Sequence, residues 1–183
     1  VAIFLRIPVR ELFAQLDNQV ARDALVVSLK TSAIAHIAVL VFGTPTAYLL
    51  ARKRFFGRSA VLTLIELPLV LPPAVAGIAL LAAFGRFGLL GHQLDALGIQ
   101  IGFTQTAVVL AVAFVESPFY LRGAIAAFES VDENLISAAR TLGAGPLRTF
   151  FRVILPLAWG GLAAGEAISL ARGIGEFGAT IMF

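Results

Sequence analysis

Residues 137–156 read SAARTLGAGPLRTFFRVILP, a charged stretch of helix-forming residues that is interrupted by two glycines and a proline. On either side of it the sequence is apolar for long enough to cross a lipid bilayer. The stretch carries three arginines between these apolar segments. It is therefore the part of the chain best suited to contact another protein from the membrane surface.

The composition indicates an integral membrane protein. Of the 183 residues, 59% are hydrophobic and 14% are charged, whereas soluble domains have about 25% charged residues. A soluble all-helical domain with very apolar helices is the alternative, but several windows exceed the ~18 apolar residues typical of a span. The absence of cysteine excludes disulfides and thiolate metal sites. The net charge of +3 comes from basic residues scattered at the ends of apolar segments, so no nucleic acid is expected as a partner.

Four windows are long enough to cross the membrane as helices: 24–51, 59–84, 103–128 and 153–171. The flanks 1–5 and 180–183 resemble the cut ends of two more spans, which predicts six spans in an intact protein and a chain truncated at both ends. We expect an all-α, polytopic helix bundle in the lipid membrane, with residues 1–183 forming a single transmembrane domain.

The distribution of arginine and lysine predicts which loops face the cytoplasm. Loop 52–58 carries four positive and no negative charges, so the positive-inside rule places it in the cytoplasm. Alternation of the spans then places loop 129–152 in the cytoplasm and loop 85–102 outside. The charged stretch quoted above is therefore predicted to face inward from a multi-pass protein of the inner (cytoplasmic) membrane.

The second window contains three prolines within six residues, Pro68, Pro72 and Pro73. Proline removes helix hydrogen bonds, so this window is expected to be broken or kinked. Irregular backbone at membrane depth lines a cavity or is buried against protein. The prolines are therefore candidates for a pathway or gate, and a kink that only packs helices is the alternative.

Three glutamates and one histidine lie within or at the edges of the windows. Glu66, Glu116 and Glu166 are candidates for a pathway or gating role, because intramembrane carboxylates are costly and usually functional. Interfacial placement or a hydrogen bond to a neighbouring helix is the alternative. His36 has no second metal ligand nearby in the sequence, so we expect a helix–helix hydrogen bond there and no metal site.

Glycines mark two features near the end of the chain. Gly161-x-x-x-Gly165, with alanines beside it, forms a small-residue face that another helix can approach closely, in the same chain or in a dimer. Residues 173–178, GIGEFG, match the dinucleotide-binding pattern G-x-G-x-x-G. We reject this match, because the pattern follows a membrane helix rather than a strand. Its glycines are expected to form a turn between spans.

The sequence contains no machinery for hydrolysis. It has no G-x-x-x-x-G-K-[ST] phosphate loop and too few histidines for the usual metal or triad motifs. We therefore expect no enzymatic activity, cofactor or metal in this chain. Active transport would need energy from a partner or from an ion gradient.

Local signals within loop 129–152 predict a short helix, a hinge and a second helix. Residues 130–133, SVDE, have the pattern of a capping box, so the first helix is expected to begin near Val131, with Arg140 in its last turn. Gly143 suits a C-terminal cap, and Pro146 suits the first turn of the next helix. A solvated connection without a partner is the alternative to a docking element. One face of the first helix carries a narrow apolar stripe of Leu135, Ala138, Ala139 and Leu142.

This loop resembles the EAA motif of binding-protein-dependent ABC importer permeases, in which E-A-A precedes three residues, a glycine, nine residues and I-x-L-P. The motif falls here on Ser137-Ala138-Ala139, Gly143, Val153 and Leu155-Pro156, with Ser137 replacing the glutamate and Val153 the isoleucine. The resemblance implies a MetI-like homodimer that works with two copies of a separate ABC ATPase subunit and with a periplasmic or extracellular substrate-binding protein. It also implies that the loop docks in a cleft of the ATPase, through Glu133, Ser137, Ala138, Ala139, Arg140, Leu142 and Gly143.

Three further stretches resemble the molybdate/tungstate branch of these permeases: 66–77 (ELPLVLPPAVAG), 84–91 (FGRFGLLG) and 175–183 (GEFGATIMF). Sulfate permeases have similar stretches, so sulfate or thiosulfate is the alternative substrate. An oxyanion disfavours carboxylates along its path, so the three membrane glutamates fit packing, interfaces or gating better than substrate contact. The candidates for a pathway or gate are Pro68, Pro72, Pro73, Glu66 and Glu176.

Two hypotheses come from other classes of protein. An ion-coupled secondary transporter would use membrane carboxylates as proton or sodium sites. A membrane scaffold would transport nothing.

Overall fold

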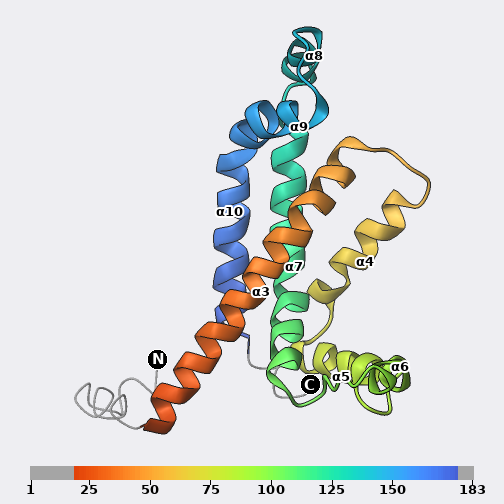
Figure 1. Ribbon diagram of the computed structural model, residues 1–183, viewed down its shortest axis with the longest axis vertical. Coiled ribbons are helices and arrows are strands. Elements are labelled where there is room, and N and C mark those ends of the chain that lie inside the picture. Colours follow the sequence, from red (N-terminus) through yellow and green to blue (C-terminus); the bar gives the residue numbers. More distant parts are fainter. Residues whose placement is uncertain (1–18, 177–183) are drawn as a thin grey trace.

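The structure, a computed structural model, describes residues 19–176, and all the regular elements in this range are helical. Helix α7 (Gln105–Glu129) lies at the centre of the bundle. Helices α3 (Gln19–Arg52) and α10 (Leu155–Ile174) pack along two sides of it, and α4 (Arg58–Val70) lies against a further part, as Figure 1 shows. The predicted all-α bundle is confirmed.

Three segments of the described chain are long and apolar enough to cross a membrane: Leu25–Arg52, Gln105–Glu129 and Pro146–Ile174. They correspond to the predicted windows 24–51, 103–128 and 153–171. Residues 1–5 and 180–183, the expected remnants of two more spans, lie outside the described residues.

The remaining window, 59–84, is not a single span. It divides into α4, with 13 residues, and α5 (Pro73–Phe84), with 12. Leu71 and Pro72 between them have extended backbone, with ψ of 132° and 139°. The predicted break at the prolines is confirmed, but the prediction of four spans is corrected to three, because 13 residues of helix extend only about 20 Å. Helix α5 and the short α6 (Gly91–Ala96) lie across the end of α7 (Figure 1).

An aromatic cluster joins α3, α7 and the turn that leads into α10, at the opposite end of the bundle. The ring of Tyr48 contacts the rings of Phe128 and Phe150, with centroids 5.5 and 4.9 Å apart. Both contacts are edge-to-face, the arrangement that aromatic quadrupoles favour. Nearby, the hydroxyls of Thr44 and Tyr120 form a 2.6 Å hydrogen bond between α3 and α7. These contacts fix the end of the bundle from which loop 129–152 emerges.

Small residues allow α7 and α10 to approach closely. A Cβ atom added to Gly123 would lie 2.8 Å from the Cα of Gly165, and one added to Gly161 would lie 2.6 Å from the Cβ of Ala127. Both distances are shorter than side chains tolerate. The small-residue face predicted for 161–165 is therefore used within the chain, for packing against α7.

We predict that Gly123→Ala destabilises the protein, although alanine is intrinsically the better helix former. The new methyl group would meet the backbone of α10 and push the helices apart, at a cost of about 1–3 kcal/mol. Thermal unfolding in detergent micelles measures the effect. Gly160→Ala is the matched control, since nothing lies within 4 Å of its added Cβ. Equal unfolding temperatures for the two variants would contradict the prediction.

Candidate functional site

The helix at the centre of loop 129–152, α8 (Glu133–Thr141), projects beyond the ends of α7 and α10 (Figure 1). Its N-cap is Asp132, whose side chain accepts a 2.9 Å hydrogen bond from the backbone N–H of Asn134. The capping box predicted at Ser130 is wrong, and the helix begins at Glu133 rather than near Val131. The reason is that Ser130 ends α7, where its hydroxyl donates to the carbonyl of Ala127.

The hinge after α8 is built as the sequence predicts. Gly143 has a positive φ of 83° and lies at the end of the helix. Its N–H donates to the carbonyl of Arg140 at 2.9 Å, and the N–H of Ala144 donates to that of Ala139 at 3.0 Å. These two bonds form a Schellman motif, which satisfies carbonyls that the helix end would leave free.

A second helix follows the hinge without a further break. Gly145 is the N-cap and Pro146 the first residue of α9 (Pro146–Thr149). The chain then passes through one π-helical turn, η1 (Phe150–Ile154), directly into α10. The continuation into the membrane was predicted, whereas the π-helical turn was not.

Most residues predicted to dock an ATPase are exposed on α8 and its hinge. These are Glu133, Ser137, Ala138, Arg140, Leu142 and Gly143, while Ala139 is half-buried. Leu135 is also exposed, so the apolar stripe is open to a partner. Sequence reasoning missed Ile136, which is 2% exposed and joins the core of α3, α7 and α10. Ile136 is a large β-branched residue that lies away from the apolar stripe, and this could have indicated that it packs against the bundle.

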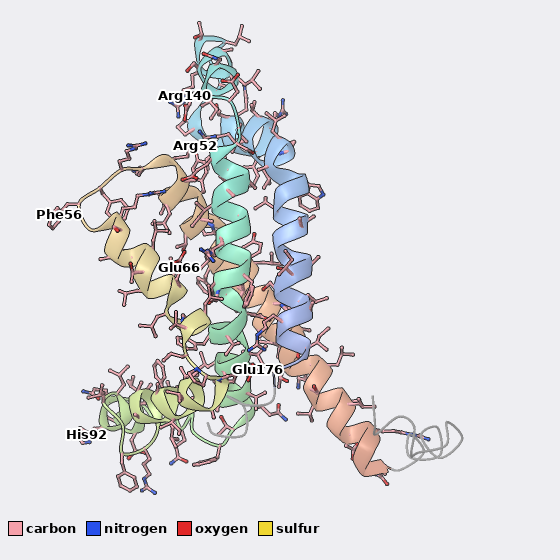
Figure 2. The ribbon with its side chains drawn as sticks, turned by 180° about the vertical axis from the view of Figure 1, so that it is seen from behind. Arg52, Phe56, Glu66, His92, Arg140 and Glu176 are labelled. Carbon is pink, nitrogen blue, oxygen red and sulfur yellow. The ribbon has the colours of Figure 1, made fainter. Side chains whose placement is uncertain are left out.

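Two arginines tie loop 52–58 to the root of α8. Arg52 lies 2.5 Å from the carboxylate of Glu133 and donates to the carbonyl of Val131 at 3.1 Å. Arg58 donates to the carboxylate of Glu129 at 2.9 Å. The two loops predicted to be cytoplasmic therefore lie at the same end of the bundle and contact each other. Figure 2 shows Arg52 and Arg140 at this end.

A buried polar cluster lies at the junction of the three spans. The Nδ1 atom of His36 on α3 is 3.0 Å from the carboxylate of Glu116 on α7 and 3.8 Å from that of Glu166 on α10. The hydroxyl of Ser169 donates to the backbone carbonyl of Glu116 at 3.2 Å. The described residues include no group arranged to hold a metal ion. The sequence indicated a helix contact for His36 but could not show that both carboxylates meet it.

The five pathway or gate candidates do not converge on one place. Glu66 lies on α4, where its carboxylate is 3.1 Å from the Nε of Arg122 on α7. Pro68 is buried within α4, and Pro72 and Pro73 form the break after it. Glu176 lies beyond the far end of α10 and pairs with Arg172 at 2.7 Å. Figure 2 shows Glu66 and Glu176 at different levels along the bundle.

Gly173 and Gly175 of the rejected dinucleotide pattern lie at the end of α10, where the N–H of Glu176 donates to the carbonyl of Gly173 at 3.1 Å. This is a turn, as expected. Gly178 and the rest of the stretch 177–183 lie outside the described residues.

Three apolar segments, together with a hinged helix that projects from the bundle, define an integral membrane protein with an exposed helix at one end. Residues 43–183 match the family described as "Binding-protein-dependent transport system inner membrane component". The chain belongs to this family and is a multi-pass permease of the inner membrane.

Several relatives of the chain are named for molybdenum transport. It is 42% identical over 183 residues to the molybdenum transport system permease protein ModB of Mycobacterium tuberculosis, covering all of this chain and 69% of that protein. It is 45% identical over 162 residues to the protein of the same name from Escherichia coli, covering 88% of this chain and 71% of that protein. A probable molybdenum ABC transporter permease protein of Haloferax volcanii is 42% identical over 171 residues, covering 93% and 62%.

We predict that Glu116→Leu destabilises the protein by about 1–3 kcal/mol, because it leaves buried polar groups without their partner. Glu116→Gln is the matched control, since it keeps the shape and a hydrogen-bonding group beside His36. Glu116→Gln should lower the free energy of unfolding by less than half as much as Glu116→Leu. Thermal unfolding of both variants in the same detergent tests this, and a leucine variant as stable as the wild type would refute it.

Proposed function

We propose that this chain is the translocation subunit of an ATP-driven importer of molybdate, and of the chemically similar tungstate. The observation that carries the proposal is the 42% identity, over the whole length of the chain, to a permease named for molybdenum transport. An extracytoplasmic binding protein delivers the oxyanion, and two copies of the chain form the path through the membrane.

The ATP-hydrolysing site belongs to a separate subunit in this proposal, because the chain has no phosphate-binding loop. Helix α8 is the docking element for that subunit. Its exposed stripe of Leu135, Ala138 and Leu142 fits the groove of a partner, as in other cases in which a helix binds in a groove. Ser137 stands where the motif has a glutamate, so the partner meets a hydroxyl there instead of a charge.

Motion of the ATPase reaches the spans through the contacts around α8. On one side, Ile136 and the Arg52–Glu133 pair connect α8 to α3 and α7. On the other side, the hinge leads into α9, η1 and α10 without interruption. A displacement of α8 is therefore transmitted to three spans together, which suits rigid-body switching between inward-facing and outward-facing states.

Sulfate or thiosulfate is the second candidate substrate. Sulfate, molybdate and tungstate are tetrahedral dianions, and the binding protein performs most of the selection among them. Reconstitution in proteoliposomes with the ATPase and the binding protein, followed by uptake of radiolabelled molybdate or sulfate with and without ATP, tests the proposal. Uptake that is the same with and without ATP would refute the proposal. Uptake of sulfate alone would identify sulfate, rather than molybdate, as the substrate.

We predict that Gly143→Val abolishes ATP-dependent uptake while the protein stays in the membrane. A β-branched side chain at a φ of 83° costs more than the roughly 1–2 kcal/mol of an ordinary left-handed residue, so the hinge changes shape. Co-purification of the ATPase subunit measures docking directly. Gly145→Ala is the matched control, because its φ is −67° and its Cβ would meet nothing. Full ATP-dependent uptake by the Gly143→Val variant would refute the proposal that the hinge couples α8 to the spans.

We also predict that Arg52→Gln lowers uptake two- to fivefold while ATPase docking is kept. The ion pair with the exposed Glu133 contributes about 0.2–1 kcal/mol, so a moderate effect is expected. Combining Arg52→Glu with Glu133→Arg restores the pair with reversed charges and should recover part of the uptake. No recovery, together with a normal amount of protein in the membrane, would show that the ion pair does not position α8.

A further inference from the structure

Arg122 and Glu66 form an ion pair, and Arg122 lies within the segment Gln105–Glu129, which is long and apolar enough to cross a membrane. The Nε of Arg122 on α7 is 3.1 Å from the carboxylate of Glu66 on α4, and the two side chains are 62% and 42% exposed. Arg122 precedes Glu129, the last residue of α7, by seven positions. At 1.5 Å per residue it lies about 10 Å inward from that end of the helix.

A second ion pair, two helical turns away, joins the same two helices. Arg58 at the start of α4 pairs with Glu129 at the end of α7, at 2.9 Å. Arg122 and Glu129 are seven residues apart and therefore on one face of α7. In the pair at the helix ends the arginine, Arg58, belongs to α4, whereas in the other pair the arginine, Arg122, belongs to α7. Helix α4 is thus fixed to one face of α7 at two levels.

This face of the central helix is covered only in part by α4. Between Glu116 and Glu129, the exposed residues of α7 are Arg122, Ala126 and Glu129, and the others are buried or half-buried. Their spacing of four and three residues makes a single stripe along the helix. Packing by α3 and α10 leaves this strip of α7 uncovered, and α4 covers it only in part, so Arg122 stays 62% exposed.

Contact with the hydrocarbon of the membrane is energetically unfavourable for this stripe, because it carries the charged Arg122. A charged residue within a membrane helix is costly, with a maximum of about 2.5–3.5 kcal/mol at the helix centre, and such residues face a bundle interior or a water-filled cavity. Arg122 contacts Glu66 through Nε, and its side chain remains 62% exposed, so part of the guanidinium group is open to a further partner. A guanidinium group binds tetrahedral oxyanions in a bidentate manner.

We propose that Arg122 is an anion-binding residue of the translocation pathway and that Glu66 is the counter-ion from which the passing oxyanion displaces it. This inference rests on the proposed import of an oxyanion. Without the anion, Glu66 neutralises Arg122 and holds it at the open stripe. With the anion, competition from Glu66 keeps binding weak enough for release, which conduction requires. The carboxylate of Glu66 can therefore lie beside the path of an anionic substrate, because it is paired with Arg122.

Cysteine labelling tests the site without requiring transport. The chain has no cysteine of its own, so Glu66→Cys introduces a single thiol beside Arg122. Thiols react as thiolates, which form in water and not in lipid. We expect the anionic reagent 2-sulfonatoethyl methanethiosulfonate to label this cysteine in inverted membrane vesicles, and millimolar molybdate to slow the labelling at least threefold. Leu64→Cys, at similar depth on another face of α4, is the matched control.

The labelling outcomes separate the site from the substrate. Labelling no faster than at position 64 would refute a water-filled path. Fast labelling that neither molybdate nor sulfate slows would refute the anion site. Protection by sulfate alone would keep the anion site and remove molybdate as the substrate.

Transport by the reconstituted importer gives the second test. Arg122→Gln should lower ATP-dependent molybdate uptake at least tenfold while the ATPase subunit still co-purifies, and Arg122→Lys should keep part of the uptake. Arg54→Gln, which removes the same charge from exposed loop 52–58, should behave as the wild type. Normal uptake by Arg122→Gln would overturn the inference. A wild-type importer without ATP-dependent uptake, but with a protected cysteine at position 66, would refute the proposed function and leave the anion site standing.

Discussion

The close contact between α7 and α10 is the constraint on which the rest of the bundle depends. In lipid, no hydrophobic effect drives helices together, so their association relies on van der Waals contact between surfaces that fit. Gly123 and Gly165 supply that fit by leaving the two backbones against each other. Once α10 is seated there, Glu166 reaches His36 across the junction, and Ile154 enters the core beside Phe128. The hinged helix at the end of the bundle is placed by the same contact.

The sequence predicted the features that depend on local chemistry. Long apolar windows located three spans, clustered prolines located the break in the fourth window, and Gly143 located the hinge. The start of α8 was placed two residues early because Ser130 and Asp132 are both good capping residues. Only the length of α7 decides between them, since α7 continues to Glu129 and uses Ser130 as its own end.

Pairings between distant residues could not be predicted in the same way. His36 and Glu116 are 80 positions apart, and Arg52 and Glu133 are 81 positions apart. Their contacts depend on how far each helix is rotated about its axis and where it crosses its neighbour. A single sequence fixes neither quantity, because small faces such as 161–165 fit another helix of the chain or a second copy equally well. The candidate site was therefore predictable as a loop, and its attachment to the bundle was not.

The π-helical turn η1 determines how the segment before it is rotated about the helix axis relative to α10. Residues 150–154 are wound more widely than the helices on either side, so the turn takes up one more residue than an α-helical turn. An α-helix advances by about 100° for each residue, so the faces before and after η1 are offset by about that angle. The hinge can therefore point away from the bundle while Gly161 and Gly165 point at α7. A chain one residue shorter in this turn would turn Gly161 and Gly165 away from α7.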